Sequence, residues 1–421
     1  MPVRLNVLRT ALRSYSQHTA ASVKTTVPTA KLSVVGIGGA GGNIVSRMHA
    51  MRAAALDSHD DRAMSFVIAN TDAQALTQFD AKAMRLVQLG PDFTSGLGAG
   101  TNPDVGAEAA TESIGAVMDA IGDTRLVFLA AGMGGGTGTG AAPVIARACR
   151  AAGIVTVALA TLPFEFEGVH RARVAFNGVQ TLAASVDALV LLPNQRLMSL
   201  ADGPDVPFAE AFRLLDTVIM DGVQSISDLM VRPALVNLDF ADVRTVLQTG
   251  GLAILSTGKA SGENRASVAA LAALQHPLYQ ALDLSQAKSA LISIVGDGTV
   301  SLSEVRTIAN TITAAVGPEA NVVVGAAIDE SRATDGVRRV ADGEDSELLV
   351  RGEDRDSELR VSLVITGIPM NTPENPATVD ESALLASVRG SAKKSKVDAA
   401  SSASSSSSLF SSWFEALKKW W

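Results

Sequence analysis

The chain has 421 residues, of which 47% are hydrophobic and 19% charged, so it is long and apolar enough for two packed domains and is not disordered as a whole. Its net charge is −8, with 43 acidic and 35 basic residues, which argues against nucleic acid as a main partner. The single cysteine, Cys149, excludes an internal disulfide and a metal site of several thiolates. No apolar run reaches the roughly 18 residues needed to cross a bilayer.

The first 30 residues have the composition of an organelle presequence. Serine and threonine are frequent in this segment, the first acidic residue is Asp57, and residues 13–16 resemble a mitochondrial processing site. The arginines of the segment are Arg4, Arg9 and Arg13. We therefore predict a location in the mitochondrial matrix, peripheral to the inner membrane, with the plastid stroma as the alternative. An N-terminal extension without a targeting role stays open.

From residue 31 onward, short β-rich runs alternate with helical segments. The runs lie at residues 32–35, 66–69, 126–130, 154–159 and 188–192. This alternation is typical of an α/β fold with a largely parallel sheet and helices on both faces. We place this first domain at residues 31–207.

A long amphipathic helix is predicted at residues 208–231, where apolar side chains recur at spacings of three and four. They are Phe208, Phe212, Leu215, Ile219, Val223, Ile226 and Met230. At 1.5 Å per residue this helix would be about 36 Å long and would join two domains. A second α/β domain is predicted at residues 232–368, with strands at 290–295, 321–328 and 360–366. A flexible linker is predicted at residues 369–408, which are rich in proline, serine and lysine.

Two glycine clusters each follow a predicted strand. The first, residues 36–43, reads Gly-Ile-Gly-Gly-Ala-Gly-Gly-Asn, and backbone N–H groups at such a strand-to-helix turn bind phosphate. By itself it also fits the dinucleotide pattern GxGxxG and permits an oxidoreductase, with Asp57 near the position of a ribose-binding acid. The second cluster, residues 132–140, favours a triphosphate, because two phosphate loops then meet at one sheet edge.

Residues 134–140 carry the tubulin signature GGGTGTG, and the chain closely resembles the tubulin/FtsZ family over residues 31–367. Further motifs follow in the same order: NTDAQAL at 70–76, GLGAGTNP at 96–103, PFEFEG at 163–168 and NLDFAD at 237–242. The resemblance implies a Rossmann-like GTPase domain of the tubulin/FtsZ fold, a long central helix, a second α/β domain and a disordered C-terminal tail.

The resemblance also implies GTP and GDP as ligands and assigns the residues that contact them. Those near the phosphates are Gly38, Gly39, Gly41, Gly42, Asp72, Gly98, Ala99, Gly100, Thr101, Gly134, Gly135, Gly136, Thr137, Gly138 and Thr139, and those at the ribose and phosphates are Glu167 and Arg171. Those at the base are Asn43, Asn194, Phe212 and Asp216. One carboxylate can accept both N1–H and N2–H of guanine, so Asp216 would select guanine over adenine. Phe212 could stack on the purine or belong to the core.

Asn237, Asp239 and Asp242 match the family's synergy loop, which enters the nucleotide pocket of the next subunit. The resemblance therefore implies a head-to-tail homopolymer for organelle division that hydrolyses GTP upon assembly. Asp239 and Asp242 would orient water and assist Mg²⁺, which would be held mainly by phosphates and water without a dedicated protein metal site. The alternatives are a structural filament scaffold with little GTP turnover and, less consistent with the motifs, an oxidoreductase. A paralogue as a second partner stays open.

The last 13 residues, 409–421, form a predicted amphipathic helix. Its apolar residues are Leu409, Phe410, Trp413, Phe414, Leu417, Trp420 and Trp421, and they span an arc of about 140° at 3.6 residues per turn. Lys418 and Lys419 lie on the opposite side. The pattern predicts contact with the organelle inner membrane or with a membrane adaptor.

Overall fold

The computed structural model describes residues 32–55, 64–196, 207–231, 234–236, 239–276, 279, 282–328 and 358–369. The predicted presequence at 1–30, the terminal segment at 409–421, Asn237 and all but the first residue of the predicted linker lie outside these residues. None of the helices in the described ranges is both long enough and apolar enough to span a membrane.

Six parallel strands form the first half of the sheet, in the order β3-β2-β1-β4-β5-β6. They are β1 (Leu32–Ile37), β2 (Met64–Asn70), β3 (Arg85–Gln88), β4 (Leu126–Gly132), β5 (Val155–Leu162) and β6 (Ala188–Pro193). The central strands are buried on both faces, which explains their unbroken apolar sequences. All five predicted strands of this half are confirmed. The sequence does not predict β3, whose four residues include exposed Arg85.

Helices connect these strands and cover the sheet. They are α2 (Gly38–Ala55), α3 (Ala73–Leu76), α4 (Pro91–Thr94), α5 (Pro103–Glu112), α6 (Ile114–Ile121), α7 (Thr137–Ala151) and α8 (Val169–Ala183), with short 3₁₀ turns η1 (Glu165–Glu167) and η2 (Asn194–Arg196). Because β1 and β4 are neighbours, the helices that follow them, α2 and α7, begin side by side at the same sheet edge.

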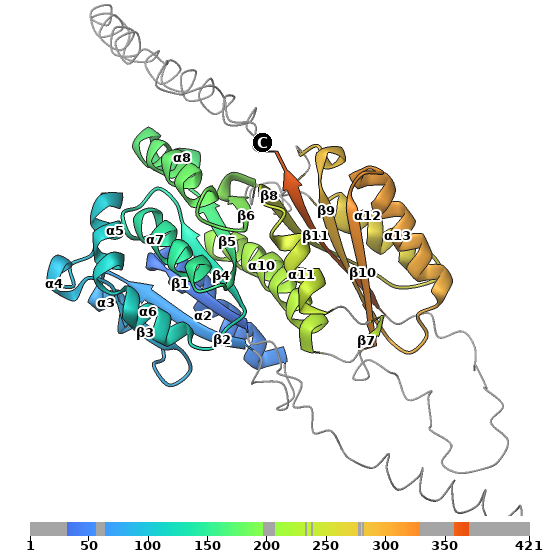
Figure 1. Ribbon diagram of the computed structural model, residues 1–421, viewed down its shortest axis with the longest axis horizontal. Helices are drawn as coiled ribbons and strands as arrows, with labels where there is room; N and C mark the ends of the chain where they lie inside the picture. The colour runs from blue at the N-terminus through green and yellow to red at the C-terminus, as the bar shows by residue number, and fades with distance from the viewer. Residues whose placement is uncertain are drawn as a thin grey trace, which may run out of the picture.

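Helix α10 (Phe208–Val231) lies between the two halves of the molecule (Figure 1). Its buried residues Leu215, Ile219, Val223 and Ile226 follow the predicted apolar stripe, and the helix predicted at 208–231 is confirmed. The helix packs against α2 on the side of the first half and against β8 and β11 on the other. It therefore connects the first half of the molecule to the second.

The second half contains β7 (Ala234–Val236), α11 (Phe240–Leu247), β8 (Leu252–Ala260), α12 (Arg265–Leu274), η4 (Leu284–Gln286), β9 (Ser289–Gly296), α13 (Leu302–Val316), β10 (Asn321–Ile328) and β11 (Leu359–Ile368). Its three predicted strands are confirmed as β9, β10 and β11. The sequence does not predict β8, which carries Gly258 where α12 packs closely: an added Cβ would lie 2.0 Å from the Ala269 carbonyl oxygen.

Within the described residues both halves share one mixed sheet, in the order β3-β2-β1-β4-β5-β6-β8-β11-β9-β10-β7. The link is short: β6 and β8 pair in parallel through Leu189 with Leu252 and Val190 with Ala253. Strand β11 runs antiparallel between β8 and β9. The domain boundaries at residues 207 and 232 stay predictions, because the sheet continues from one half into the other.

A buried ion pair ties the second half to the central helix. Arg360 on β11 donates from Nη2 to Oδ2 of Asp228 on α10 at 2.7 Å, and both side chains are buried. Gln224, one turn earlier on α10, donates to the other Asp228 oxygen at 2.7 Å. A buried charge is stable only when it is paired, so this contact fixes where α10 sits on the sheet.

Candidate functional site

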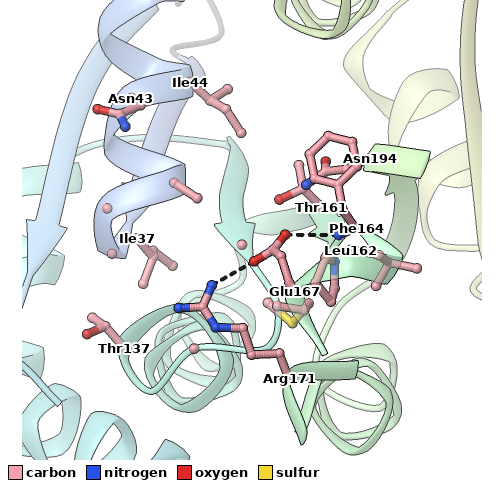
Figure 2. Close-up of a pocket in the computed structure, with 18 of the residues that line it drawn as sticks. Ile37, Asn43, Ile44, Thr137, Thr161, Leu162, Phe164, Glu167, Arg171 and Asn194 are labelled. Carbon is pink, nitrogen blue, oxygen red and sulfur yellow. Dashed lines mark hydrogen bonds and ion pairs between the residues drawn. The ribbon is translucent and has the colours of Figure 1, made fainter. Parts of the chain in front are cut away.

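A cleft of about 750 Å³ opens at the carboxyl ends of β1, β4, β5 and β6. Ile37, Gly132 and Leu162 from the first three strands line it, together with Asn194, which follows β6. Figure 2 shows the side chains of Ile37, Leu162 and Asn194 around the cavity. The carboxyl edge of a parallel sheet is where such folds bind nucleotides, and the volume suits a nucleotide-sized ligand.

The first turns of α2 and α7 meet in this cleft. Gly38 has a φ of 72°, a conformation that favours glycine, and a Cβ added there would lie 3.1 Å from the backbone nitrogen of Gly138. Neither helix carries an acidic residue in its first turn. The positive ends of two helices therefore line the same cleft, an arrangement that favours binding of phosphate.

The glycines around the cleft differ in the space available for a side chain. At Gly41 an added Cβ would lie 2.1 Å from the Ala130 carbonyl oxygen, and at Gly42 it would lie 3.0 Å from the ring of Phe79, so neither position tolerates a side chain without a shift. The structure thus places Gly41 and Gly42 in the packing of α2, outside the cleft lining. Glycines that line the cleft with nothing within 4 Å of an added Cβ are Gly39, Gly100 and Gly135.

Three further residues predicted near the phosphates also line the cleft: Gly136, Thr137 and Gly138. The hydroxyl of Thr137 lies 2.7 Å from that of Thr71, which fixes its orientation at the start of α7.

The other residues predicted near the phosphates do not line the cleft. They are Asp72, Gly98, Ala99, Thr101, Gly134 and Thr139. Asp72 accepts the Ala75 amide at 3.0 Å as the N-cap of α3, and Thr139 accepts the Gly134 amide at 2.9 Å. These side chains hold the loops in shape, because their hydrogen bonds are local. Their contact with a nucleotide stays a prediction.

Glu167 and Arg171 face the cleft as a pair (Figure 2). Arg171 Nη1 donates to Glu167 Oε2 at 2.6 Å, and the amide of Phe164 donates to Glu167 Oε1 at 2.9 Å. The arginine side chain is half exposed, so its charge remains available at the cleft wall. Each carboxylate oxygen of Glu167 thus accepts one hydrogen bond, and the remaining lone pairs can accept hydrogen bonds from the hydroxyl groups of a ligand.

Asn43 and Asn194 lie on opposite sides of the cavity in Figure 2. Asn194 is only 8% exposed, yet its Oδ1 has no hydrogen-bond partner within the described residues. A buried polar oxygen without a partner costs free energy, and a ligand that donates a hydrogen bond would remove that cost. The amide donors of a purine base are groups of this kind.

Phe212 lies between the cleft and the hydrophobic core. It lines the cleft, and it also packs on the hydrophobic core as a half-buried residue of α10. Its ring meets that of Phe164 edge to face, with centroids 5.9 Å apart and an interplanar angle of 83°. Packing of Phe212 on the core is therefore observed, and its stacking on a purine stays a prediction.

Asp216, one helical turn after Phe212 on α10, does not line the cleft itself. Its side chain is 1% exposed, and its carboxylate accepts hydrogen bonds from Nε and Nη2 of Arg47, the latter at 3.1 Å. Burial raises the pKa of Asp216 above its ordinary value, although the hydrogen bond and charge of Arg47 oppose that shift. Arg47 itself lines the cleft.

The sequence did not predict that Arg47, Phe164 and Phe166 line the cleft. Arg47 lies four residues after Asn43 on α2, so helical spacing could have placed both on one face. Phe164 and Phe166 belong to the PFEFEG motif, and their rings stack with centroids 4.9 Å apart. Phe166 is 72% exposed at the cleft, a position that favours contact with a ligand or partner over a core role.

Asp239 and Asp242 are far from the cleft of their own chain. They begin α11, which follows α10 and β7 in the chain, whereas Phe212, which lines the cleft, belongs to the second turn of α10. Its 24 residues correspond to about 36 Å. In the described part of the chain, no three or more His, Cys, Asp or Glu side chains gather where they could hold a metal ion.

Comparison with known proteins agrees with this geometry. Residues 31–202 match the model of the tubulin/FtsZ family GTPase domain, and residues 251–341 match that of the FtsZ family C-terminal domain. The chain is 48% identical over 346 residues to cell division protein FtsZ 2 of Rhizobium meliloti, covering 82% of this chain and 90% of that protein. It is 48% identical over 318 residues to FtsZ of Caulobacter vibrioides, covering 76% of this chain and 60% of that one.

Solved structures give the same result. An empty FtsZ dimer from M. jannaschii superposes with a TM-score of 0.66 at 36% identity, covering 85% of this chain and 92% of that one. CetZ2 from Haloferax volcanii, in a GTPγS-bound protofilament, has a TM-score of 0.62 at 21% identity, covering 86% and 99%, and shares the fold. From its family models, relatives and fold, the chain belongs to the tubulin/FtsZ family, with its GTPase domain at residues 31–202 and its FtsZ-type C-terminal domain at residues 251–341.

Proposed function

We propose that this protein binds and hydrolyses GTP as a self-polymerising filament protein of division, and that each active site is completed by the next subunit. The observation that carries the proposal is the separation of two half-sites by α10. The nucleotide cleft lies at one end of this helix, and the acidic turn with Asp239 and Asp242 follows the other end. Family membership supports the GTPase and filament parts of the proposal.

In the proposed complex, the triphosphate lies on the first turns of α2 and α7. Gly39, Gly100 and Gly135 leave room for close backbone approach, and Arg171 offsets phosphate charge. Glu167 accepts the ribose hydroxyls. The base lies between Asn43 and Asn194 beside the Phe212 ring, with Asp216 behind it as the group that reads guanine.

The second half of each active site comes from the neighbouring subunit. Asp239 and Asp242, with Asn237, are proposed to orient the attacking water, since phosphoryl transfer depends mostly on positioning and charge neutralisation. Mg²⁺, when bound, would neutralise phosphate charge and would be held mainly by phosphate oxygens and water, with Asp239 and Asp242 assisting. One chain bearing complementary half-sites at its two ends assembles head to tail into a filament.

For the location, we propose an organelle, with the mitochondrial matrix favoured over the plastid stroma on the basis of residues 1–30. A paralogue is a further proposed filament partner.

Residues 409–421 are proposed to bind the inner membrane, with a membrane adaptor as the alternative. Flotation with anionic liposomes, using the full chain and a chain truncated after Ser408, separates membrane from adaptor. Equal flotation of the two would reject direct tethering. An internal fluorescent tag at residues 342–356 would report the compartment while leaving both ends intact.

The test of the proposed function is phosphate release from GTP as protein concentration rises. Shared catalysis predicts little release below a threshold and a specific rate that climbs steeply above it, together with sedimentable filaments. Assembly without phosphate release would instead identify a structural scaffold that binds GTP. A specific rate independent of concentration would show that a single chain is catalytically complete and would reject the shared site.

A further inference from the structure

Arg47 on α2 and Asp216 on α10 form a side-chain pair across the helix contact behind the base pocket. The guanidinium donates from two nitrogens, Nε and Nη2, to the two carboxylate oxygens. Such bidentate pairing fixes both the position and the plane of the carboxylate. The two residues are 169 positions apart in the sequence, so the contact depends wholly on how α10 packs against α2.

The environments of the two partners differ sharply. Asp216 is 1% exposed, whereas the Arg47 side chain is 38% exposed and forms part of the cleft wall. A carboxylate buried to this degree is costly in its charged form unless a cation accompanies it. Arg47 supplies that cation while its own charge stays in contact with the cleft solvent.

The helical spacing places this pair next to the predicted base contacts. Asn43 and Arg47 are four residues apart on α2, and Phe212 and Asp216 are four residues apart on α10, so each pair shares a helix face. Asn43, Arg47 and Phe212 all line the cleft. Each carboxylate oxygen can accept more than one hydrogen bond, so two donors from Arg47 leave acceptor capacity for a ligand.

We propose that Arg47 is a positioning residue for base selection: it holds the Asp216 carboxylate charged and oriented so that this carboxylate accepts the N1–H and N2–H donor pair of guanine. The inference rests on the proposed guanine-nucleotide function and adds a residue to it. Arg47 acts through Asp216. Its loss leaves a buried carboxylate that takes up a proton or turns away, and either change removes the double acceptor.

The experiment compares binding of GDP and IDP to the full-length protein, because inosine keeps N1–H but lacks the 2-amino group. We expect wild type to prefer GDP and Arg47→Ala to lose most of that preference, by about tenfold or more, because GDP loses two hydrogen bonds to Asp216 whereas IDP, which keeps only N1–H, loses one. Arg47→Lys keeps the positive charge but cannot donate from two nitrogens in one plane, so it should retain part of the preference for GDP over IDP. Arg213→Ala removes an exposed arginine beside Phe212 and serves as the matched control, with an unchanged GDP to IDP ratio.

A double variant keeps the test decisive if Arg47→Ala alone folds poorly. Asp216→Asn removes the buried charge, and Arg47→Ala added to it should lower the GDP preference no further, because Arg47 then has no carboxylate to position. An equal loss in both backgrounds would overturn the inference, as would an unchanged ratio or tighter GDP binding in Arg47→Ala. If wild type binds neither GDP nor IDP, the proposed function fails instead.

Discussion

Asp239 and Asp242 cap the same helix reciprocally. The Asp242 amide donates to Asp239 Oδ1 at 2.9 Å, and the Asp239 amide donates to Asp242 Oδ2 at 3.4 Å, which forms a capping box at the start of α11. Asp239 is exposed and Asp242 half-buried, so both carboxylates remain near the surface. The two residues proposed to complete a neighbour's active site therefore also have a structural role in their own chain.

Asp239→Ser separates these two roles. Serine is a good N-cap, so the free energy of unfolding should change by a few tenths of a kcal/mol, whereas Asp239→Ala should lose about 1 kcal/mol. Both variants lack the carboxylate, and both should lose most assembly-dependent phosphate release. Urea unfolding and GTP turnover measured on the same preparations provide the comparison. Turnover that follows stability, retained in Asp239→Ser and lost in Asp239→Ala, would assign this residue to capping alone.

Gly39 and Gly41 should respond oppositely to alanine. Gly41→Ala places a Cβ 2.1 Å from a backbone oxygen and should destabilise the fold by about 1–3 kcal/mol, because α2 must move away from β4. Gly39→Ala meets nothing within 4 Å and should leave stability unchanged or slightly higher, while weakening GDP binding by intruding on the phosphates. Thermal unfolding with and without GDP measures both effects. Normal GDP binding by a stable Gly39→Ala would contradict the proposed phosphate position.

Asn194→Leu should leave the nucleotide-free protein at least as stable as wild type, because the buried Oδ1 has no partner to lose in the described structure. The same change should weaken GDP binding by about tenfold or more, corresponding to about 1–3 kcal/mol for a hydrogen bond that is no longer made. Isothermal titration and urea unfolding give the two numbers. Loss of stability without loss of affinity would place Asn194 in the scaffold.

GDP binding should weaken on acidification, starting at a higher pH than an ordinary aspartate would give. Burial raises the pKa of Asp216, and only its charged form accepts both guanine donors. For the nucleotide-free fold the sign is opposite: burying the charged form costs stability as pH rises through that raised pKa. The test is to measure the GDP affinity of wild type and Asp216→Asn at a series of pH values from acidic to neutral. Because the two proteins are compared at the same pH, the ionisation of the GDP phosphates is the same for both. Parallel pH profiles for the two proteins would remove Asp216 from base recognition.

Arg360→Met should be among the more destabilising substitutions in the second half of the chain. It leaves Asp228 buried without its arginine, for which a loss of about 3–5 kcal/mol is typical. Arg360→Met combined with Asp228→Leu removes both charges and should recover much of that loss. Urea unfolding of wild type and of these two variants measures the changes in the free energy of unfolding. A double variant no more stable than Arg360→Met would show that the pair's geometry, rather than the unpaired charge, matters.

The sequence alone predicted most of the elements that form the site. Unbroken apolar runs predicted β1, β2, β4, β5 and β6, because strands buried on both faces leave that pattern. The period of the apolar stripe predicted α10 over 208–231, and the glycine signature predicted the strand-to-helix turns of the nucleotide cleft. β3 and β8 escaped prediction because exposed or small residues interrupt their apolar patterns, including Arg85 and Gly258.

The sequence by itself determined local conformation, ligand class and family, since period, turn chemistry and motif order are properties of neighbouring residues. Tertiary structure alone decided that a side chain at Gly39 would have open space whereas one at Gly41 would meet β4, because that depends on the backbone that lies opposite. It also decided that Arg47 meets Asp216 across 169 positions and that Arg360 meets Asp228 across 132. Those relationships arise from helix packing and sheet order, which no local pattern encodes.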